Sequence, residues 1–338
     1  MSTLTRREWL HLTLGTGVAL GLRPLDLFGQ QRLLARAIPS SGEMLPVIGL
    51  GSSATFSQVA RTEDITALRE VLRTLVDGGG RLFDTAPQYG ASEEVAGRLV
   101  NELGYVDRVF WATKLNVAGG FPGGGRPGGP AGRGGGRPSG PGGGPTADPA
   151  AARAQVEQSF ARIKKAKIDL IQVHNMGDVA TQLPILREYK QQGRVRYIGV
   201  TTTFDQQYDA LIETMRTQAI DFIGVDYAID GREVEDRILP LARDRGIAVL
   251  VYAPFGRTRL FRRVGDRPLP DWAAEFDAKT WGQFFLKWVL GHPAVTAVTP
   301  ATSQARNMLD NLGGGVGRVP DEAMRKRMNA FIDALPNG

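Results

Sequence analysis

Four residues able to carry acid–base chemistry stand at or just after the ends of short apolar segments. Asp84, Lys114 and His174 each close such a segment, and Tyr89 follows Asp84 on the next loop. Taken singly, these residues fit ordinary roles: a buried ion pair, a loop anchor and a core histidine. Taken together, they predict one site for proton transfer, because catalytic residues gather at the carboxyl ends of the parallel strands of a barrel.

The segments that must position these residues alternate between strand and helix. Apolar runs typical of buried strands occupy residues 47–50, 82–84, 109–113, 170–174, 197–201, 222–226, 248–252 and 295–298. Amphipathic stretches typical of helices occupy residues 63–76, 92–102, 150–164, 183–192, 208–217, 233–245 and 280–290. Eight such strands predict an α/β fold closed into a single (β/α)8 TIM barrel. An extra C-terminal helix, residues 321–335, is expected to pack across the outside.

Composition narrows the classes of function. The chain has 338 residues, 42% of them hydrophobic, which suffices for one barrel domain. The absence of cysteine excludes disulfides, thiolate catalysis and Cys-bound metals, and with only three histidines no metal site is expected. The net charge of +6 is spread over the predicted helices, and no basic run carries interleaved aromatics. A nucleic-acid partner is therefore not expected.

Residues 1–37 carry the features of an export signal in the usual order. Arg6 and Arg7 precede a mostly apolar run, residues 10–22, and Ala35-Arg36-Ala37 has the form of a cleavage site. The segment resembles a twin-arginine signal. This resemblance implies the twin-arginine export machinery as a partner, a mature barrel of residues 38–338, and a periplasmic or secreted location. An amphipathic N-terminal helix is the alternative, and the apolar run is too short for a stable membrane span.

Residues 119–145 interrupt the alternation of strand and helix. The stretch is almost wholly Gly, Pro and Arg and holds 15 of the 43 glycines, so it cannot bury enough apolar surface to order itself. We expect a mobile loop there. Because it follows Lys114, it leaves from the mouth of the barrel, and both a lid and a passive insertion remain open.

Several motifs, in chain order from about residue 45 to residue 311, resemble those of the aldo-keto reductases. They are Phe83-Asp84-Thr85-Ala86 with Tyr89-Gly90 and Ser92-Glu93, Ala112-Thr113-Lys114, Asp169-Leu170-Ile171-Gln172-Val173-His174, Tyr252-Ala253-Pro254-Phe255-Gly256, and residues 298–311. The resemblance covers most of the chain. It implies the reduction of an aldehyde or ketone, or the reverse oxidation of an alcohol, with a nicotinamide cofactor.

The resemblance also assigns roles to the four candidate residues. Reduction by hydride needs a proton donor beside the developing alkoxide, and a tyrosine with a pKa near 10 donates poorly unless a cation stabilises its phenolate. Tyr89 takes the place of the general acid and Lys114 that of the cation. Asp84 would hold Lys114, and His174 would orient the substrate oxygen.

A set of cofactor-binding residues follows from the same resemblance. It comprises Ser52, Thr201, Thr202, Tyr252, Pro254, Phe255, Ser303, Asn307, Asp310 and Asn311. Tyr252 would stack on the nicotinamide, and Thr201 and Thr202 stand where the family usually has Ser-Asn for the carboxamide. Gly224 replaces a usual glutamine, so one carboxamide contact is missing. The last four members of the set match positions that hold the adenosine phosphate and the adenine. NADP is the expected cofactor, with NAD possible, and Arg306 is suited to a 2′-phosphate.

Two functions therefore stand at the level of sequence. The first is an NAD(P)H-dependent reductase of a small carbonyl compound, which the complete set of four residues favours. The second is an exported barrel of the same family with lost or altered turnover, acting as a binding or redox-sensing protein. The incomplete carboxamide contacts and the export signal favour this alternative. The substrate depends on loops whose shapes the sequence does not reveal.

Overall fold

The computed structural model describes residues 32–62, 64–118 and 146–336 of the chain. Most of the predicted export signal and the Gly-rich stretch 119–145 lie outside the described residues, as does residue 63, the first of the predicted helix 63–76. None of the helices within the described ranges is long and apolar enough to cross a membrane.

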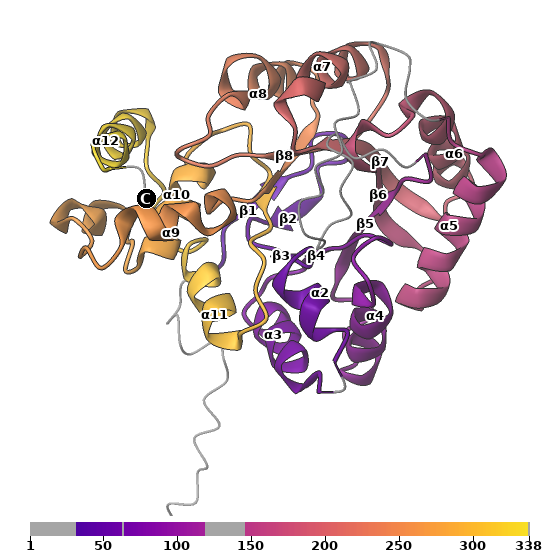
Figure 1. The fold of residues 1–338 in the computed structure, drawn as a ribbon, viewed down its shortest axis with the longest axis horizontal. Coiled ribbons are helices and arrows are strands. Elements are labelled where there is room, and N and C mark those ends of the chain that lie inside the picture. Colours follow the sequence, from indigo (N-terminus) through magenta and orange to yellow (C-terminus); the bar gives the residue numbers. More distant parts are fainter. Residues whose placement is uncertain (1–31, 63, 119–145, 337–338) are drawn as a thin grey trace, which may run out of the picture.

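Eight parallel strands form one sheet in which each strand pairs with the next one along the chain. They are β3 (Leu50–Gly51), β4 (Leu82–Asp84), β5 (Phe110–Leu115), β6 (Ile168–Val173), β7 (Val195–Thr202), β8 (Phe222–Asp226), β9 (Ala248–Tyr252) and β10 (Ala297–Val298). Single bridges from Ile48 to Val298 and from Gly51 to Ala301 join the last strand to the first. The sheet thereby closes, and the predicted (β/α)8 barrel is confirmed (Figure 1).

Helices surround the strands (Figure 1). They are α2 (Thr55–Val59), α3 (Thr66–Asp77), α4 (Ser92–Glu102), α5 (Pro149–Ile163), α6 (Val179–Gln191), α7 (Tyr208–Thr217), α8 (Val234–Asp244), α9 (Arg259–Val264), α10 (Trp281–Leu290), α11 (Ala305–Gly313) and α12 (Glu322–Asp333). Capping side chains set several starts: Asp148, Thr280 and Asp321 each accept a hydrogen bond from a backbone N–H of the first turn. The predicted C-terminal helix is α12. The short helices α2 and α9 were not predicted, nor was α11.

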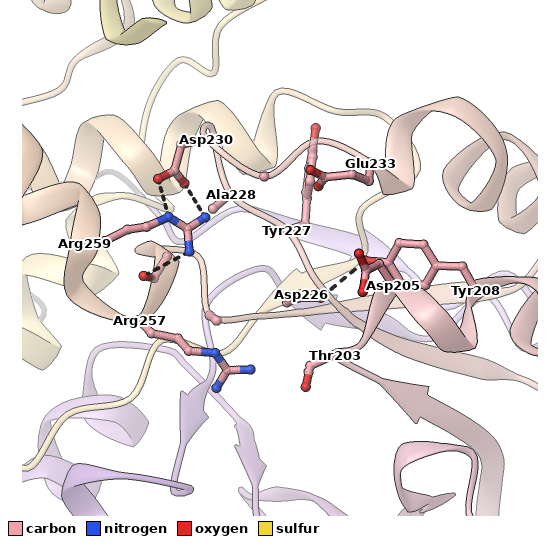
Figure 2. Close-up of a pocket in the computed structure, with 13 residues that line it drawn as sticks. Thr203, Asp205, Tyr208, Asp226, Tyr227, Ala228, Asp230, Glu233, Arg257 and Arg259 are labelled. Carbon is pink, nitrogen blue, oxygen red and sulfur yellow. Dashed lines mark hydrogen bonds and ion pairs between the residues drawn. The ribbon is translucent and has the colours of Figure 1, made fainter. Parts of the chain in front are cut away.

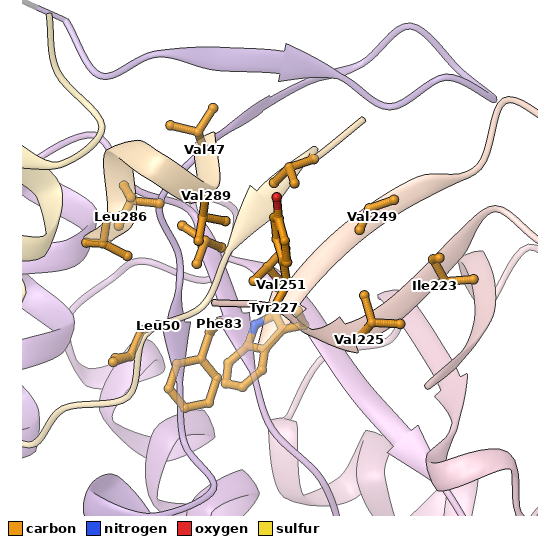
Figure 3. Packing of buried hydrophobic residues seen from close by; sticks show 14 of the residues in the cluster. Val47, Leu50, Phe83, Ile223, Val225, Tyr227, Val249, Val251, Leu286 and Val289 are labelled. Atoms are coloured by element: carbon orange, nitrogen blue, oxygen red, sulfur yellow. The ribbon is translucent and has the colours of Figure 1, made fainter. Parts of the chain in front are cut away.

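The loops at the carboxyl ends of β7, β8 and β9 surround a polar cavity at the mouth of the barrel (Figure 2). Along each strand, side chains alternate between the barrel interior and the surrounding helices. In β9, Ala248 and Leu250 point inward, whereas Val249 and Val251 belong to the outer core, together with Leu286 and Val289 of α10 (Figure 3). The inward positions at the carboxyl ends are the ones that carry the polar residues of the mouth.

An antiparallel hairpin covers the other end of the barrel. Its strands are β1 (Ala35–Ala37) and β2 (Met44–Pro46). The Arg36 guanidinium donates to the carbonyl of His292 at 2.9 Å and also to the carbonyls of Leu290 and Val295. The triplet interpreted as a cleavage site is thus a folded strand. The barrel includes residues N-terminal of the boundary predicted at residue 38, because a small-residue triplet also suits a short strand.

Candidate active site

Asp84, Tyr89, Lys114 and His174 lie together at the carboxyl ends of β4, β5 and β6. The Lys114 ammonium donates to Asp84 Oδ2 at 2.7 Å and to the carbonyl of Thr85 at 2.8 Å. The Tyr89 hydroxyl lies 3.4 Å from Nε2 of His174, and the two rings meet edge to face. The Lys114 ammonium is 5.2 Å from the centre of the Tyr89 ring.

Strand register explains why these side chains meet. Asp84 is paired with Ala112, two residues before Lys114, so both polar side chains fall in the inward alternation of neighbouring strands. Lys114 in turn is paired with Gln172, two residues before His174. Because Asp84, Lys114 and His174 are at most 5% exposed, their interactions are little screened by water.

Burial and neighbouring charges set the charge states of Tyr89, His174 and Lys114. Burial raises the pKa of Tyr89, against the pull of Lys114, so the phenol keeps its proton. Burial lowers the pKa of His174 well below its ordinary value, with Lys114 adding to the effect, so the ring is neutral near pH 7. Burial also lowers the pKa of Lys114, but Asp84 and Tyr89 raise it more, and the net direction is upward. The mouth therefore holds a protonated acid, a neutral imidazole and a fixed cation.

Two further residues support His174 and were missed by the sequence interpretation. Gln88 Oε1 lies 3.4 Å from His174 Nδ1, and Gln88 Nε2 donates to the carbonyl of Asn116 at 3.0 Å. Asn116 Nδ2 donates to the carbonyl of His174 at 3.1 Å. Both residues are close in sequence to predicted catalytic residues: Gln88 directly precedes Tyr89, and Asn116 is two residues after Lys114. This closeness was the only signal in the sequence that could have indicated them.

Tyr252 and Ser52, two of the expected cofactor residues, also lie at this mouth. The Tyr252 hydroxyl is 3.2 Å from Asp84 Oδ1 and 3.1 Å from Gln172 Oε1, and Lys114 Nζ is 5.1 Å from its ring centre. The buried Ser52 hydroxyl at the end of β3 has no hydrogen-bond partner in the described part of the chain, and the same holds for the Thr85 hydroxyl. Buried polar groups normally have partners, so these hydroxyls are suited to a ligand.

The threonines expected at the carboxamide are engaged by the loops around the mouth. The Thr201 hydroxyl oxygen accepts from the backbone N–H of Asn175 at 3.1 Å and keeps its own proton for donation. The Thr202 hydroxyl donates to Gln207 Oε1 at 2.5 Å and accepts from the N–H of Phe204. The local turn after β7 therefore uses Thr202 in a way that its place in the motif did not reveal.

The remaining cofactor candidates divide between surface and packing positions. Ser303 and Asn307, at the start of α11, retain exposed surface. Asp310 accepts from Thr280 Oγ1 at 2.8 Å and from Gln283 Nε2 at 2.9 Å, so it ties α11 to the start of α10. Three other candidates have packing environments: Asn311 and Pro254 are buried, and the Phe255 ring lies 5.0 Å from that of Phe261.

The cavity at the ends of β7, β8 and β9 has a volume of about 210 Å³ and is lined by charged residues. Arg259 forms a bidentate pair with Asp230, whereas Arg257 points away from that pair (Figure 2). Arg257 makes no hydrogen bond or ion pair with any described residue within normal distances. It lies on a stretch of three successive positive φ angles, from Gly256 to Thr258. Such backbone strain is typical of ligand-binding loops.

The described residues hold no group of three His, Asp or Glu side chains placed to bind a metal.

Comparisons with known proteins agree with this architecture. The model of the Aldo/keto reductase family matches residues 47–330. Aldo-keto reductase YhdN of Bacillus subtilis is 30% identical over 227 residues, which are 65% of this chain and 62% of that protein's length. The structure of an aldo-keto reductase from Klebsiella pneumoniae in complex with NADPH has a TM-score of 0.66 at 20% identity, over 89% of this chain and 95% of that one. The glycerol dehydrogenase of Gluconobacter oxydans has a TM-score of 0.66 at 22% identity, over the same shares of the two chains. With its family match over most of the barrel, the chain belongs to the aldo/keto reductase family.

Proposed function

We propose that the protein reduces an aldehyde or ketone, or oxidises the corresponding alcohol, and that Tyr89 is the general acid. The observation that carries this proposal is the Tyr89 hydroxyl, 3.4 Å from a neutral His174 and beside the buried Lys114 ammonium. A carbonyl oxygen beside Tyr89 and His174 would receive the phenolic proton as negative charge develops on it. Lys114 would stabilise the phenolate that remains, and Asp84 would keep Lys114 in place.

We propose NADP as the cofactor, with NAD possible, because the groups around the mouth fit a nicotinamide nucleotide. The hydroxyls of Ser52 and Thr85, which have no hydrogen-bond partner among the described residues, offer polar contacts within the barrel, and Tyr252 offers an aromatic face. Arg257, unpaired among the described residues, is suited to a diphosphate, and Arg306 in the first turn of α11 is suited to a 2′-phosphate. The bound nucleotide would supply the hydride. The Klebsiella pneumoniae structure in complex with NADPH supports the assignment.

The decisive experiment is the oxidation of NADPH by the purified protein across a panel of aldehydes and ketones. Tyr89→Phe keeps the ring and removes the proton donor, so we expect kcat/KM to fall by about 10²-fold or more, with nucleotide affinity nearly unchanged. Tyr105→Phe, which removes a hydroxyl bonded to Asp77 on the outside of the barrel, is the matched control. Full activity in Tyr89→Phe would exclude Tyr89 as the acid.

A second candidate function is that of a binding or redox-sensing protein with lost or altered turnover. Two observations favour it: Gly224 has no side chain for the carboxamide, and the Thr202 hydroxyl is already engaged. Because a reductase also binds the nucleotide, the two functions are separated by combining a titration with NADPH, followed through tryptophan fluorescence, with the turnover assay on the carbonyl panel. Nucleotide binding without turnover on any carbonyl of the panel would support this candidate.

We also propose that the N-terminal segment directs export by the twin-arginine route and that the protein acts in the periplasm or outside the cell. Since β1 belongs to the barrel, we place any cleavage before Leu33. Replacing Arg6 and Arg7 together by lysine is expected to block export. Unchanged secretion of this variant would contradict the proposal, and so would a protein whose N terminus is still Met1. A mature N terminus at residue 38 would contradict only the placement of the cleavage before Leu33.

A further inference from the structure

The carboxylate of Asp84 is held from two sides. Its Oδ2 accepts from Lys114 of β5, and its Oδ1 lies 3.2 Å from the hydroxyl of Tyr252, which comes from β9 across the barrel. In the described residues, no other donor reaches the side-chain oxygens of Asp84. A buried carboxylate needs several hydrogen bonds to remain ionised, so the phenol of Tyr252 supplies what Lys114 alone does not.

Gln172 fixes the Tyr252 hydroxyl from a third strand. Its Oε1 lies 3.1 Å from that hydroxyl, while its Nε2 donates to the carbonyl of Val200 at 3.4 Å. Since a hydroxyl has a single proton, Tyr252 shares it between the amide oxygen and the carboxylate. The carboxylate is the stronger acceptor because it is charged.

Gly224 provides the space that lets Tyr252 reach Asp84. Gly224 stands in the inward register of β8, and a Cβ at this position would lie 2.4 Å from Cε2 of the Tyr252 ring and 2.6 Å from its hydroxyl oxygen. Both distances are well inside the closest contact that a real Cβ makes. Any side chain at residue 224 would therefore displace the ring. Glycine is needed here for close approach.

We propose that Tyr252 is a positioning residue for Asp84, and through it for Lys114 and Tyr89, and that Gly224 determines its placement. The catalytic consequence rests on the proposed reductase function. The structural part does not, because the contact between Tyr252 and Asp84 exists in the protein alone. The hydroxyl of Tyr252 thus has a role in addition to the stacking role of its ring. Gly224, the glycine that interrupts the family motif, makes the room that this role requires.

The expected signature of this role is a change in acid-side titration. A hydrogen bond to the charged form of a carboxylate favours ionisation, so its loss raises the pKa of Asp84. The groups facing Asp84 are Lys114 from β5, Tyr252 from β9 and Tyr89 from the loop after β4. His174 of β6 faces Lys114, and Arg257 acts on Tyr89 from the loop after β9. Of these groups, only Asp84 and His174 titrate on the acid side.

The test compares Tyr252→Phe and Gly224→Ala with the wild type. Tyr252→Phe keeps the ring, so NADPH affinity should stay within about twofold, while kcat falls about tenfold and the acid limb of kcat/KM moves up by about one pH unit. Gly224→Ala keeps the tyrosine but displaces it, and the same upward shift is expected. Tyr197→Phe is the matched control. Its hydroxyl contacts Glu43 and Ser41 near the opposite end of the barrel, so it should lower thermal stability without moving the limb.

A second measurement reads Asp84 directly and needs no turnover. In protein with 13C-labelled aspartate carboxyl groups, the Asp84 resonance, assigned with Asp84→Asn, should titrate at higher pH in Tyr252→Phe and Gly224→Ala than in the wild type. If the wild type reduces no carbonyl compound but the two variants still show this shift, the inference is supported and the reductase proposal is overturned. An unchanged Asp84 titration in Tyr252→Phe would overturn the inference, and an unchanged titration in Gly224→Ala would remove the role of Gly224.

Discussion

At the scale of single residues, Lys114 is where the interactions of the mouth converge. Its ammonium binds Asp84 and the carbonyl of Thr85, and it lies close to the rings of both Tyr89 and Tyr252. It is 2% exposed, so the charge cannot be replaced by solvent. A group in this position affects the acid, the carboxylate and the second phenol at once.

Lys114 and Tyr89 are therefore expected to act as one catalytic unit, so that removing the charge of Lys114 has about the same effect as removing the hydroxyl of Tyr89. We expect Lys114→Met to lower kcat/KM by about 10²-fold or more, and the double variant with Tyr89→Phe to be hardly worse than either single variant. Lys114→Met also leaves Asp84 buried without its cation, at a cost of about 3–5 kcal/mol in unfolding free energy. Lys165→Met, at a partly exposed lysine 3.4 Å from Asp169, is the control. Multiplicative losses in the double variant would mean that the two residues act independently.

Arg257 offers a separate test of nucleotide binding. Because its guanidinium lacks an ion pair among the described residues, Arg257→Met should raise the Kd for NADPH by about tenfold without large loss of stability. Arg327, on α12 and paired with Glu275, is a matched control at which the same substitution should have no effect. Fluorescence titration measures both variants. If the nucleotide Kd is unchanged while KM rises for carbonyl substrates that carry an anion, Arg257 contacts the substrate.

At the scale of elements, the hairpin of β1 and β2 closes the barrel end opposite the mouth. Ile38 and Leu45 pack into the barrel interior. Arg36 donates to three backbone carbonyls, those of Leu290 at the end of α10 and of His292 and Val295 before β10. Buried carbonyls that lose their donor destabilise the fold. The hairpin is therefore part of the domain even though it precedes the first barrel strand.

A chain that begins at residue 38 should accordingly be less stable than one that begins at residue 32. We expect its melting temperature to be lower by roughly 5 °C, which corresponds to a loss of about 2 kcal/mol, since about 1 kcal/mol shifts the melting temperature by about 2–4 °C in domains of about 150–250 residues. Arg36→Met in the longer chain should reproduce part of the loss. Equal melting temperatures for the two chains would show that β1 contributes little.

At the scale of the whole molecule, the buried His174 and the partly buried His292 make stability depend on pH. Burial, with Arg325 adding to it, lowers the pKa of His292 from 6.5 to about 4, and burial also lowers that of His174. Between about pH 6.5 and 4 the unfolded chain binds protons at these positions and the folded chain does not. Acidification in this range therefore favours unfolding, whereas above pH 7 the two residues have no such effect.

The corresponding prediction concerns His292, whose Nδ1 accepts from the N–H of Ala294 at 3.2 Å. Asparagine can provide an acceptor there without titrating. His292→Asn should flatten the fall in unfolding free energy between about pH 6.5 and 4, as measured by denaturant titration at several pH values. An identical slope in the variant would place the acid sensitivity in other groups, with Asp84 and His174 next to be examined.

The sequence by itself determined the barrel and four of the residues that lie at its mouth. Alternating apolar runs and amphipathic stretches specify strands and helices locally, and eight such units in order leave few topologies. Asp84, Lys114 and His174 were recognisable because each ends a strand, and Tyr89 because it follows one. Those signals are short-range, so no knowledge of the packing was required.

Only the tertiary structure decided how residues far apart in the chain use the space between them. The contact of Tyr252 with Asp84 joins residues 168 positions apart, and it depends on strand register and on the missing side chain of Gly224. The same holds for Asp310, which accepts hydrogen bonds from Thr280 and Gln283, and for Arg36, which donates to backbone carbonyls at the end of the barrel opposite the mouth. Side-chain volume and the closure of the sheet determine such contacts, and no local pattern encodes them, because the partners meet only when the barrel is complete.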